Sequence, residues 1–420
     1  MNSERFHRNS AAVISVGDEI LLGQTVDSNS AYIARSLSAI GVLVGEMKTT
    51  PDRAESIIVA VKETVGKYGV IVVTGGLGPT SDDLTRPALA KYFGRELVFR
   101  EDLLKKIEER FSSRGVKMPE TVKVQAYFPS GAEAIPNQYG TAPGILFREG
   151  EVLLFAVPGV PREMQGMVDD FIVPLLLKEQ RGRPFRFRVI RTAGAGESVL
   201  SERIGDFPFP DVGLAYLPKY GCVDLRISAL GMNEREVEAR LDLAEVYIES
   251  VAGDYIYGYG ETELAEAAGD LLRERGWKLA VAESCTGGLL GGMITDIPGS
   301  SDYFAGGFIV YCNEMKISQL GVPEAIIAEF GAVSLETAVR LAEGAAARAG
   351  VEVGIGVTGI AGPAGGTAEK PVGTVYIAVA LPGRTEVERF NFRDDRIMNR
   401  KRSAFAALNM LYRTLQTVSE

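Results

Sequence analysis

Short apolar runs alternate with amphipathic stretches through the first part of the chain. Strands are predicted at Ala11–Val16, Gly41–Met47 and Gly69–Thr74. Between them, Ser28–Ile40 and Arg53–Tyr68 have apolar residues every three or four positions, which predicts helices. An order of β-α-β-α-β predicts a mainly parallel sheet with helices on both faces.

Three domains are predicted from the order of these patterns. A hairpin from Gly144–Phe147 and Val152–Val157, followed by a helix, completes a three-layer domain over residues 1–173. Residues 174–258 follow the order β-α-β-β-α-β, a split βαβ unit in a small α+β domain. Residues 259–420 alternate strands and helices again and end in a long helix, so a second α/β domain is expected. The fold class is α/β.

The amino-acid composition limits which classes of protein this chain can belong to. No run of 18 or more apolar residues occurs, so we expect no membrane span. The three cysteines are far apart in sequence and form neither a disulfide framework nor a zinc motif, and the start of the chain has no signal-peptide pattern. We therefore expect a cytoplasmic protein. The net charge of −10 makes nucleic acid an unlikely partner.

His7 is the only histidine, and it precedes the first apolar run. A relay of serine or cysteine with histidine is therefore not expected, nor is a histidine-rich zinc site. Proton transfer must use a carboxylate, a lysine or a tyrosine, and any metal should be held mainly by oxygen ligands.

Polar residues follow two of the predicted amino-terminal strands. Ligands in such sheets bind beyond the carboxyl ends of the strands. The residues concerned are Glu19, Asp27 and Asn29 after the first strand, and Gly75, Gly76, Gly78, Thr80, Asp82 and Asp83 after the third. In one interpretation Asp82 or Asp83 only caps a helix. In the other interpretation, which we favour, the glycine amides bind phosphate and the carboxylates bind a divalent metal.

The stretch Ser284-Cys-Thr-Gly-Gly288 lies at a predicted turn from strand to helix. Ser284 or Thr286 could be a helix cap with Cys285 buried. Alternatively, the turn presents a nucleophile, and the helix amides bind an oxyanion or phosphate.

Two further strand ends favour the nucleophile. Tyr311 and Lys316 follow one of them, and a desolvated lysine can lose its proton and act as a base. A glycine-rich loop, Thr358–Thr367, follows the other, with Lys370 after it. Such a loop is either a flexible connection or a phosphate cradle.

Several long motifs resemble one family. GDEILLGQTVDSNS, TGGLGPTSDDLT, YGTAPGI and VPGVPREM resemble the molybdopterin-binding-like amino-terminal domain of the CinA (competence/damage-inducible) proteins. AESCTGG, DIPGSS, FIVYCNEMK, GVTGIAGPAGGT and KPVGTVY resemble their carboxy-terminal domain. The middle section is similar in position to their KH-like domain, but it has no GxxG, so RNA binding there is doubtful.

The resemblance implies two hydrolytic activities in pyridine-nucleotide salvage. The carboxy-terminal domain would convert nicotinamide mononucleotide to nicotinate mononucleotide and ammonia, with Ser284 as nucleophile, Lys316 as base, Tyr311 as a hydrogen-bonding helper and Thr286 at the oxyanion site. The amino-terminal domain would split ADP-ribose into AMP and ribose 5-phosphate at Asp82 and Asp83. The family often has serine at Cys312 and alanine at Met315.

The resemblance also implies ligand contacts, cofactors and partners. Substrate contacts are expected at Asn29, Gly75, Gly76, Gly78, Thr80, Gly287, Gly288, Ser300, Thr358, Gly359, Gly362 and Lys370, and metal ligands at Glu19, Asp27, Asp82 and Asp83. A divalent ion such as Mg²⁺ or Co²⁺ is expected at the first site, with K⁺ left open, and no cofactor at the amidase site. The expected partners are small phosphorylated nucleotides and a second copy of the chain.

Two rival functions stay open. The first is a pterin-binding module in molybdenum-cofactor assembly, because a fold by itself does not fix a function. The second is a non-catalytic interaction protein for competence or DNA repair, although the acidic charge argues against direct DNA contact.

Overall fold

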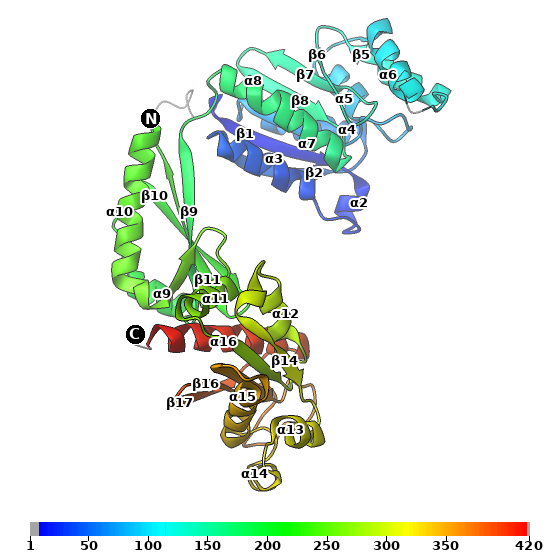
Figure 1. Cartoon of the computed structure of the whole chain (residues 1–420). Helices are drawn as coiled ribbons and strands as arrows, with labels where there is room; N and C mark the ends of the chain where they lie inside the picture. The colour runs from blue at the N-terminus through cyan, green and yellow to red at the C-terminus, as the bar shows by residue number, and fades with distance from the viewer. Residues whose placement is uncertain (1–7, 114, 418–420) are drawn as a thin grey trace. The chain divides into compact units, whose positions relative to one another are not determined.

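The computed structural model describes residues 8–113 and 115–417, so His7 lies outside the described part (Figure 1). Two compact units are present: Met1–Arg186 with Ala229–Arg240, and Phe187–Ser228 with Leu241–Glu420. Among the described residues, no helix is long and apolar enough to cross a membrane. The units are described separately below.

A six-stranded sheet forms the centre of the first unit, in the order β2-β1-β3-β8-β7-β6. Its strands are β1 (Ser10–Val16), β2 (Leu43–Thr50), β3 (Val70–Thr74), β6 (Glu133–Ile135), β7 (Gly144–Glu149) and β8 (Val152–Val157). Strands β2, β1, β3 and β8 are parallel, whereas β6, β7 and β8 pair antiparallel. The mainly parallel sheet and the hairpin predicted from the sequence are both confirmed.

Helices cover both faces of this sheet, which confirms the three-layer prediction. Alternate strand residues face opposite sides, so Val13 packs in a cluster with Leu37, and Ile14 packs in a second cluster with Ile57. The helices of the first face are α3 (Ser28–Ala39), α7 (Pro161–Met167), the π-helical η2 (Val168–Ile172) and α8 (Val173–Lys178); those of the second are α4 (Ala54–Thr64), α5 (Thr85–Tyr92) and α6 (Glu101–Ser113).

Several short elements of this unit have no periodic pattern that would predict them. They are α2 (Asp18–Leu21), the 3-10 helix η1 (Glu120–Ala126), and the two-stranded sheet of β4 (Leu97–Phe99) and β5 (Tyr127–Pro129). Helix α2 and η1 both supply residues to the cavity described below.

The middle section has the predicted β-α-β-β-α-β order and the small α+β character expected for it. Its elements are β9 (Phe185–Thr192), α9 (Glu197–Ile204), β10 (Val212–Lys219), β11 (Cys222–Leu230), α10 (Glu234–Ala252), the 3-10 turn η3 (Gly253–Tyr255) and β12 (Ile256–Tyr259). The strand order is β10-β11-β9-β12, with β9 and β12 antiparallel.

A five-stranded sheet, ordered β14-β13-β15-β16-β17, organises the carboxy-terminal part. The strands are β13 (Leu279–Glu283), β14 (Phe304–Ile309), β15 (Val353–Gly359), β16 (Thr374–Leu381) and β17 (Arg384–Asn391). Because β13, β14 and β15 are mutually parallel, their carboxyl ends meet at one edge of the sheet. Strands β16 and β17 continue the sheet antiparallel.

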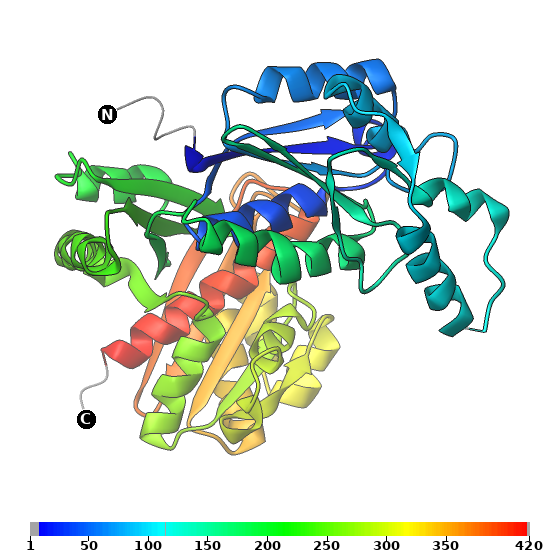
Figure 2. The same ribbon diagram turned by 90° about the horizontal axis from the view of Figure 1, so that it is seen from above.

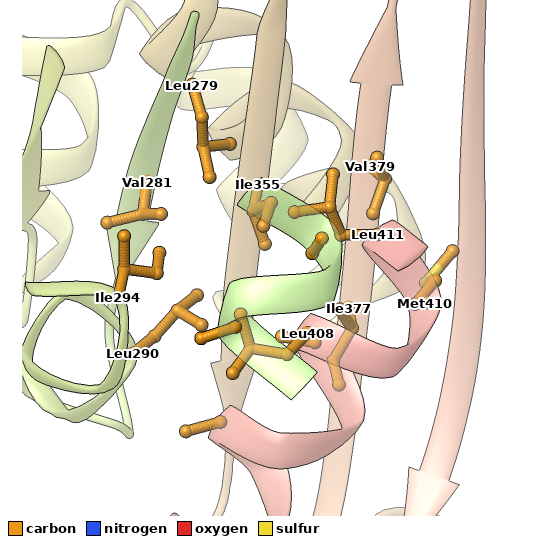
Figure 3. Close-up of a cluster of buried hydrophobic side chains, with 14 of the residues drawn as sticks. Leu279, Val281, Leu290, Ile294, Ile355, Ile377, Val379, Leu408, Met410 and Leu411 are labelled. Carbon is orange, nitrogen blue, oxygen red and sulfur yellow. The ribbon is translucent and has the colours of Figure 1, made fainter. Parts of the chain in front are cut away.

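Helices lie on both faces of this second sheet too. Leu279 and Val281 join the core with α11 (Leu264–Arg275), α12 (Leu289–Thr295) and α16 (Arg396–Gln416), as Figure 3 shows for Ile294 and Leu411. The alternate residue Ala282 packs with Leu341 on the other face. That face is covered by α13 (Asn313–Leu320), α14 (Glu324–Phe330) and α15 (Leu335–Ala349), and a 3-10 turn, η4 (Ser300–Asp302), precedes β14.

Two glycines let α15 pack directly on β15. A Cβ at Gly356 would meet the carbonyl oxygen of Ala338, and a Cβ at Gly354 would meet that of Ala342, both well inside the 3.0 Å that Cβ atoms essentially never cross. The absence of side chains therefore brings the helix backbone onto the strand.

Candidate functional site

The SCTGG turn leaves the sheet at the end of β13. The backbone N–H of Ser284 donates to Val357 O on neighbouring β15 at 3.0 Å, which fixes the first residue of the turn. Ser284 is 8% exposed. Gly287 and Gly288 then adopt left-handed conformations, with φ of 58° and 97°, which glycine reaches without steric cost. The two glycines are therefore needed for the chain to turn here.

Glu283, which the sequence analysis did not single out, caps the start of α12. Its buried carboxylate accepts hydrogen bonds from the backbone N–H groups of Gly288 at 2.8 Å, Leu290 at 3.2 Å and Gly291 at 2.8 Å. The expectation that these helix amides hold a ligand anion is therefore wrong, because a carboxylate of the protein already occupies them.

The backbone amides of Thr286 and Gly287, earlier in the turn, are not bound by Glu283. Among the described residues, none accepts a hydrogen bond from the N–H of Thr286 or Gly287. On the carbonyl side, Arg400 of α16 donates from Nε to Cys285 O at 3.2 Å and from Nη2 to Thr286 O at 2.8 Å. The arginine thus holds the turn by its carbonyl oxygens and leaves these two amides unused.

Cys285 and Thr286 are buried in this turn. Burial raises the pKa of the Cys285 thiol to about 12, so the thiolate that would act as a nucleophile is strongly disfavoured. Thr286 is 0% exposed and its Oγ1 has no hydrogen-bond partner among the described residues. The expectation that Thr286 belongs to an oxyanion site stays a prediction, for which its unbonded backbone N–H is the available donor.

Lys316 is a buried lysine beside this turn. It is 1% exposed, and its Nζ donates to Val310 O at 2.9 Å and to Tyr311 O at 3.0 Å. Burial lowers the pKa of Lys316, because the charged ammonium loses its hydration. In the described part of the chain, no carboxylate forms an ion pair with it.

Strand pairing brings the lysine and the serine to the same edge. The N–H of Val310 donates to Glu283 O at 2.9 Å, so the residue that receives the Lys316 amine is bonded to the residue before Ser284. No hydrogen bond joins Ser284 Oγ to Lys316 Nζ among the described residues. Hydrogen bonds of catalytic groups are often absent without substrate. The two residues therefore follow adjacent strand ends at one edge of the sheet.

The glycine-rich loop is tied to the same edge by α16. Arg396 donates from Nη1 to Gly362 O at 2.7 Å and from Nη2 to the Tyr311 hydroxyl at 3.1 Å. Buried Asn399 donates to Ala361 O at 3.0 Å. Tyr311 is 61% exposed and therefore accessible to a ligand. The sequence analysis missed Arg396, Asn399 and Arg400 because a long amphipathic helix marks its core face but not its polar contacts.

Two predicted contact residues, Thr358 and Lys370, have structural roles. Thr358 is buried and its hydroxyl donates to Ala332 O at 2.7 Å, while Lys370 Nζ donates to Phe330 O at 2.8 Å and anchors the loop. Gly359 ends β15 at the site edge. Ser300 precedes β14, whose start pairs with Leu279, so it lies at the edge of the sheet away from Ser284. The structure does not bring Ser300 together with the other residues.

A second site is a cavity of about 400 Å³ in the first unit. Gly75, Gly76 and Gly78 line it, together with the carboxylates of Glu19, Asp52, Asp82, Asp83 and Glu163. A Cβ at Gly75 or Gly76 would collide with Val16 O or Thr85 Oγ1, so glycine is required where the loop crosses the strand ends. Asp52 comes from a segment without a quoted motif, and Glu163 lies in the VPGVPREM motif but was not singled out there.

Asp83 and Asp27 are engaged by the protein itself. Asp83 accepts from Gly78 N at 2.7 Å and from Thr80 N at 2.8 Å, and Thr80 Oγ1 also donates to it. Asp27 caps α3 by accepting from Ser30 N at 2.9 Å, and Ser15 Oγ donates to its other oxygen at 2.7 Å.

The predicted metal-ligand roles of Asp27 and Asp83 therefore do not fit. One Asp27 oxygen caps α3 and the other accepts from Ser15 of β1, while both Asp83 oxygens accept from the glycine loop. Asn29 ties the two strand ends that flank the cavity, donating to Thr74 Oγ1 at 3.1 Å and Gly159 O at 2.8 Å.

The remaining carboxylates offer hard oxygen donors for a divalent ion. Burial raises the pKa of Asp52, and the neighbouring carboxylates of Glu19, Asp18 and Asp82 raise it further. A cation would relieve that repulsion. Within the described ranges, however, no three acidic, histidine or cysteine residues lie close enough to hold an ion by themselves. The donors fit Mg²⁺, which keeps several waters, better than a fully protein-coordinated ion.

Two buried polar side chains near this cavity were not predicted. Arg86 on α5 is 5% exposed, and burial lowers its pKa while Asp83 counteracts the effect. Gln125 of η1 lines the cavity, is 1% exposed, and its Oε1 has no hydrogen-bond partner in the described part of the chain. An unsatisfied buried acceptor costs about 1–3 kcal/mol.

Another cavity, of about 470 Å³, lies between middle-domain loops and α16 within the second unit. Gly194, Tyr220, Phe392 and Phe405 are among its lining residues, and none of the predicted site residues is. Phe390 pairs with Val375, which pairs with Gly359 at the end of β15, so one wall of this cavity lies near the edge of the sheet that carries the SCTGG turn.

Family models match three consecutive parts of the chain. A model described as a probable molybdopterin binding domain matches residues 12–178, one described as the KH domain of damage-inducible protein CinA matches residues 187–258, and one described as the CinA C-terminal domain matches residues 261–415. The chain thus combines a molybdopterin-binding-like, a KH-like and a CinA carboxy-terminal domain.

Relatives extend over the full length. A CinA-like protein of Gemmatimonas aurantiaca is 43% identical, covering 96% of this chain and 95% of its own. A putative competence-damage inducible protein of Caldicellulosiruptor saccharolyticus is 40% identical, covering 96% and 99%. The crystal structure of competence/damage inducible protein CihA from Agrobacterium tumefaciens is 40% identical and covers 37% of this chain and 94% of its own, with a TM-score of 0.36. The chain belongs to the CinA family.

Proposed function

We propose that the carboxy-terminal site hydrolyses a carboxamide, and that its substrate is nicotinamide mononucleotide. The observation that carries this proposal is the buried, ion-pair-free Lys316 amine at the strand end where Ser284 begins its turn. A chain with one histidine needs another base for its serine, and burial supplies one by lowering the pKa of Lys316.

The hydrogen bonds of Lys316 suit the neutral amine. A neutral amine has two N–H groups and one lone pair. If the N–H groups are used by Val310 O and Tyr311 O, the lone pair is left for the Ser284 hydroxyl. Lys316 then takes the hydroxyl proton while Ser284 Oγ forms a bond to the carboxamide carbon.

The turn amides stabilise the intermediate. The oxyanion accepts hydrogen bonds from the unused N–H groups of Thr286 and Gly287, and each such donor lowers the barrier by about 3–4 kcal/mol. The Lys316 ammonium returns its proton to the departing nitrogen, so ammonia leaves and an ester to Ser284 remains. Water, deprotonated by the neutral lysine, then releases the carboxylic acid and restores the serine.

The glycine-rich loop and Arg396 support a phosphorylated substrate. Arg396 is exposed and joins Tyr311 to Gly362, so a guanidinium lies between the reaction edge and the loop. Arginine matches phosphate geometry. In this proposal Gly359, Gly362 and Arg396 receive the phosphate of the nucleotide.

Product analysis tests this function. The purified chain is incubated with nicotinamide mononucleotide, and ammonia and nicotinate mononucleotide are quantified by an enzyme-coupled assay and chromatography. Equimolar formation of both is expected. Unchanged substrate, or release of free nicotinamide in place of ammonia, would refute the amidase.

We also propose that the amino-terminal cavity splits ADP-ribose into AMP and ribose 5-phosphate. A glycine loop beside a ring of carboxylates supports this second function, because glycine amides suit phosphate and carboxylates suit its counter-cation. When bound, a divalent ion would neutralise the pyrophosphate. One or two carboxylates of this ring, from Glu19, Asp52 and Asp82, would hold it, with water and the substrate phosphates as its other ligands.

A pterin is the alternative ligand of this cavity, supported by the molybdopterin description of the matching family model. Incubating the chain separately with ADP-ribose and with a pterin distinguishes the two. Formation of AMP supports the pyrophosphatase, whereas tight pterin binding without cleavage of ADP-ribose supports the binding module.

A further inference from the structure

Gln125 places an unused carboxamide in the wall of the amino-terminal cavity. It belongs to η1, a segment separate from the glycine loop and from the strand ends that carry the acidic residues. The side chain is 1% exposed and its Oε1 meets no donor among the described residues. Since buried acceptors in folded proteins are nearly always paired, the missing donor should come from what enters the cavity.

The acceptor selects the part of the ligand that it can contact. A phosphate oxygen at neutral pH has no proton to give, so a carbonyl oxygen cannot pair with it. An amino group or a hydroxyl can donate. In a nucleotide, these are the exocyclic amino group of the base and the hydroxyls of the ribose.

We infer that Gln125 accepts a hydrogen bond from the exocyclic amino group of adenine and so sets the base preference of this site. The inference rests on the proposed cleavage of ADP-ribose. Glutamine pairs with the amino-bearing edge of adenine. Hypoxanthine has a carbonyl oxygen at that position, which would face the Gln125 oxygen without a proton between them. A buried polar group left unpaired discriminates strongly against such an analogue.

Binding of three small probes to the full chain tests this assignment. AMP, IMP and ribose 5-phosphate are titrated by calorimetry into the wild-type protein and into Gln125→Leu, which keeps the volume and removes the acceptor. The wild type should prefer AMP to IMP by about tenfold. The substitution should remove that preference and leave the affinity for ribose 5-phosphate unchanged.

A neighbouring substitution and a second readout separate recognition from folding. Val124→Ala changes an exposed residue of the same short helix and should retain the preference for AMP. Unchanged affinity of the variant for ribose 5-phosphate reports whether the amino-terminal cavity is intact, which a reaction of the other unit would not.

Three results would overturn the inference. The first is that the wild type cleaves ADP-ribose and Gln125→Leu still prefers AMP to IMP. The second is that the affinity of the variant for ribose 5-phosphate falls as much as its affinity for AMP. In either case Gln125 does not recognise the base. If the wild type neither cleaves ADP-ribose nor binds AMP, the proposed pyrophosphatase fails and the inference with it.

Discussion

At the scale of single residues, the account depends on how Lys316 is held. The Lys316 amine donates to two carbonyl oxygens, and in the described part of the chain it has no carboxylate partner. Such surroundings favour the uncharged form of the amine. Glu283 has a structural role, because its carboxylate accepts hydrogen bonds from three backbone amides at the start of α12. The neighbouring residues Glu283 and Ser284 thus divide into a helix cap and a reactive hydroxyl.

The pH dependence of the amidase should report the Lys316 amine. The pKa of Lys316 is lowered by burial, so the neutral base appears at lower pH than for a free lysine. We expect kcat/KM to rise with pH through that lowered pKa and then level off. Lys316→Arg, which stays protonated, should lose about a hundredfold or more and show no such rise. An identical profile for the variant would remove Lys316 from the mechanism.

At the scale of elements, α16 joins the parts of the carboxy-terminal site. Its first two turns contact three segments: the SCTGG turn through Arg400, the glycine-rich loop through Asn399 and Arg396, and Tyr311 through Arg396. In Figure 2 the helix, drawn in red, runs along the sheet. Its amino-terminal end is therefore a positioning element for the site.

Removing the Arg400 side chain should impair the reaction without removing any reacting group. Arg400→Ala frees the carbonyl oxygens of Cys285 and Thr286, so the two turn amides lose their fixed direction. We expect kcat for ammonia release to fall by about ten- to a hundredfold, because a misplacement of about 1 Å costs that much. Lys401→Ala is the matched control, since it changes the next residue of the helix. Equal rates for Arg400→Ala and the wild type would contradict this role.

Close packing of α15 on β15 predicts a specific loss of stability. Gly356→Ala forces a methyl group onto the backbone of α15, and overpacking of this kind costs about 1–3 kcal/mol. Gly292→Ala adds a methyl group with nothing within 4 Å and should instead stabilise its helix by up to about 1 kcal/mol. Urea unfolding measures both. Equal stability of the two variants would contradict the packing argument.

The order of helices and strands along the chain and the turn after β13 were predictable, because apolar periodicity and glycine positions mark them. Asp52, Glu163 and Arg400 were not, because each acts through contacts between segments far apart in the sequence. Asp27 was assigned a ligand role on its motif, whereas its hydrogen bonds to Ser30 and Ser15 give it a structural one. Motifs locate a site, but only packing decides which polar atoms remain unused.

At the scale of the whole molecule, the two candidate sites belong to separate units. Each cavity or strand edge is built from residues of its own unit, so the two chemistries should respond separately to substitution. The family models divide the chain into three parts, and the KH-like match over residues 187–258 includes Ala229–Arg240, which belongs to the first unit.

Asp82→Ala and removal of metal should affect only the amino-terminal reaction. Asp82 lines the acidic cavity, whereas the carboxy-terminal reaction uses no metal in this account. We expect Asp82→Ala, or a chelator added to the wild type, to lower ADP-ribose cleavage at least tenfold and to leave ammonia release unchanged. Cleavage of ADP-ribose that persists at full rate in the presence of chelator would contradict the proposal that this reaction requires a divalent ion.

The most direct measurement compares ammonia release from nicotinamide mononucleotide by the wild type, Ser284→Ala and Cys285→Ala. Burial holds the pKa of Cys285 at about 12, so the account predicts that Cys285→Ala keeps a rate near that of the wild type. Ser284→Ala should lose at least about a thousandfold in kcat. An active Ser284→Ala chain beside an inactive Cys285→Ala chain would contradict the assignment of the serine as nucleophile.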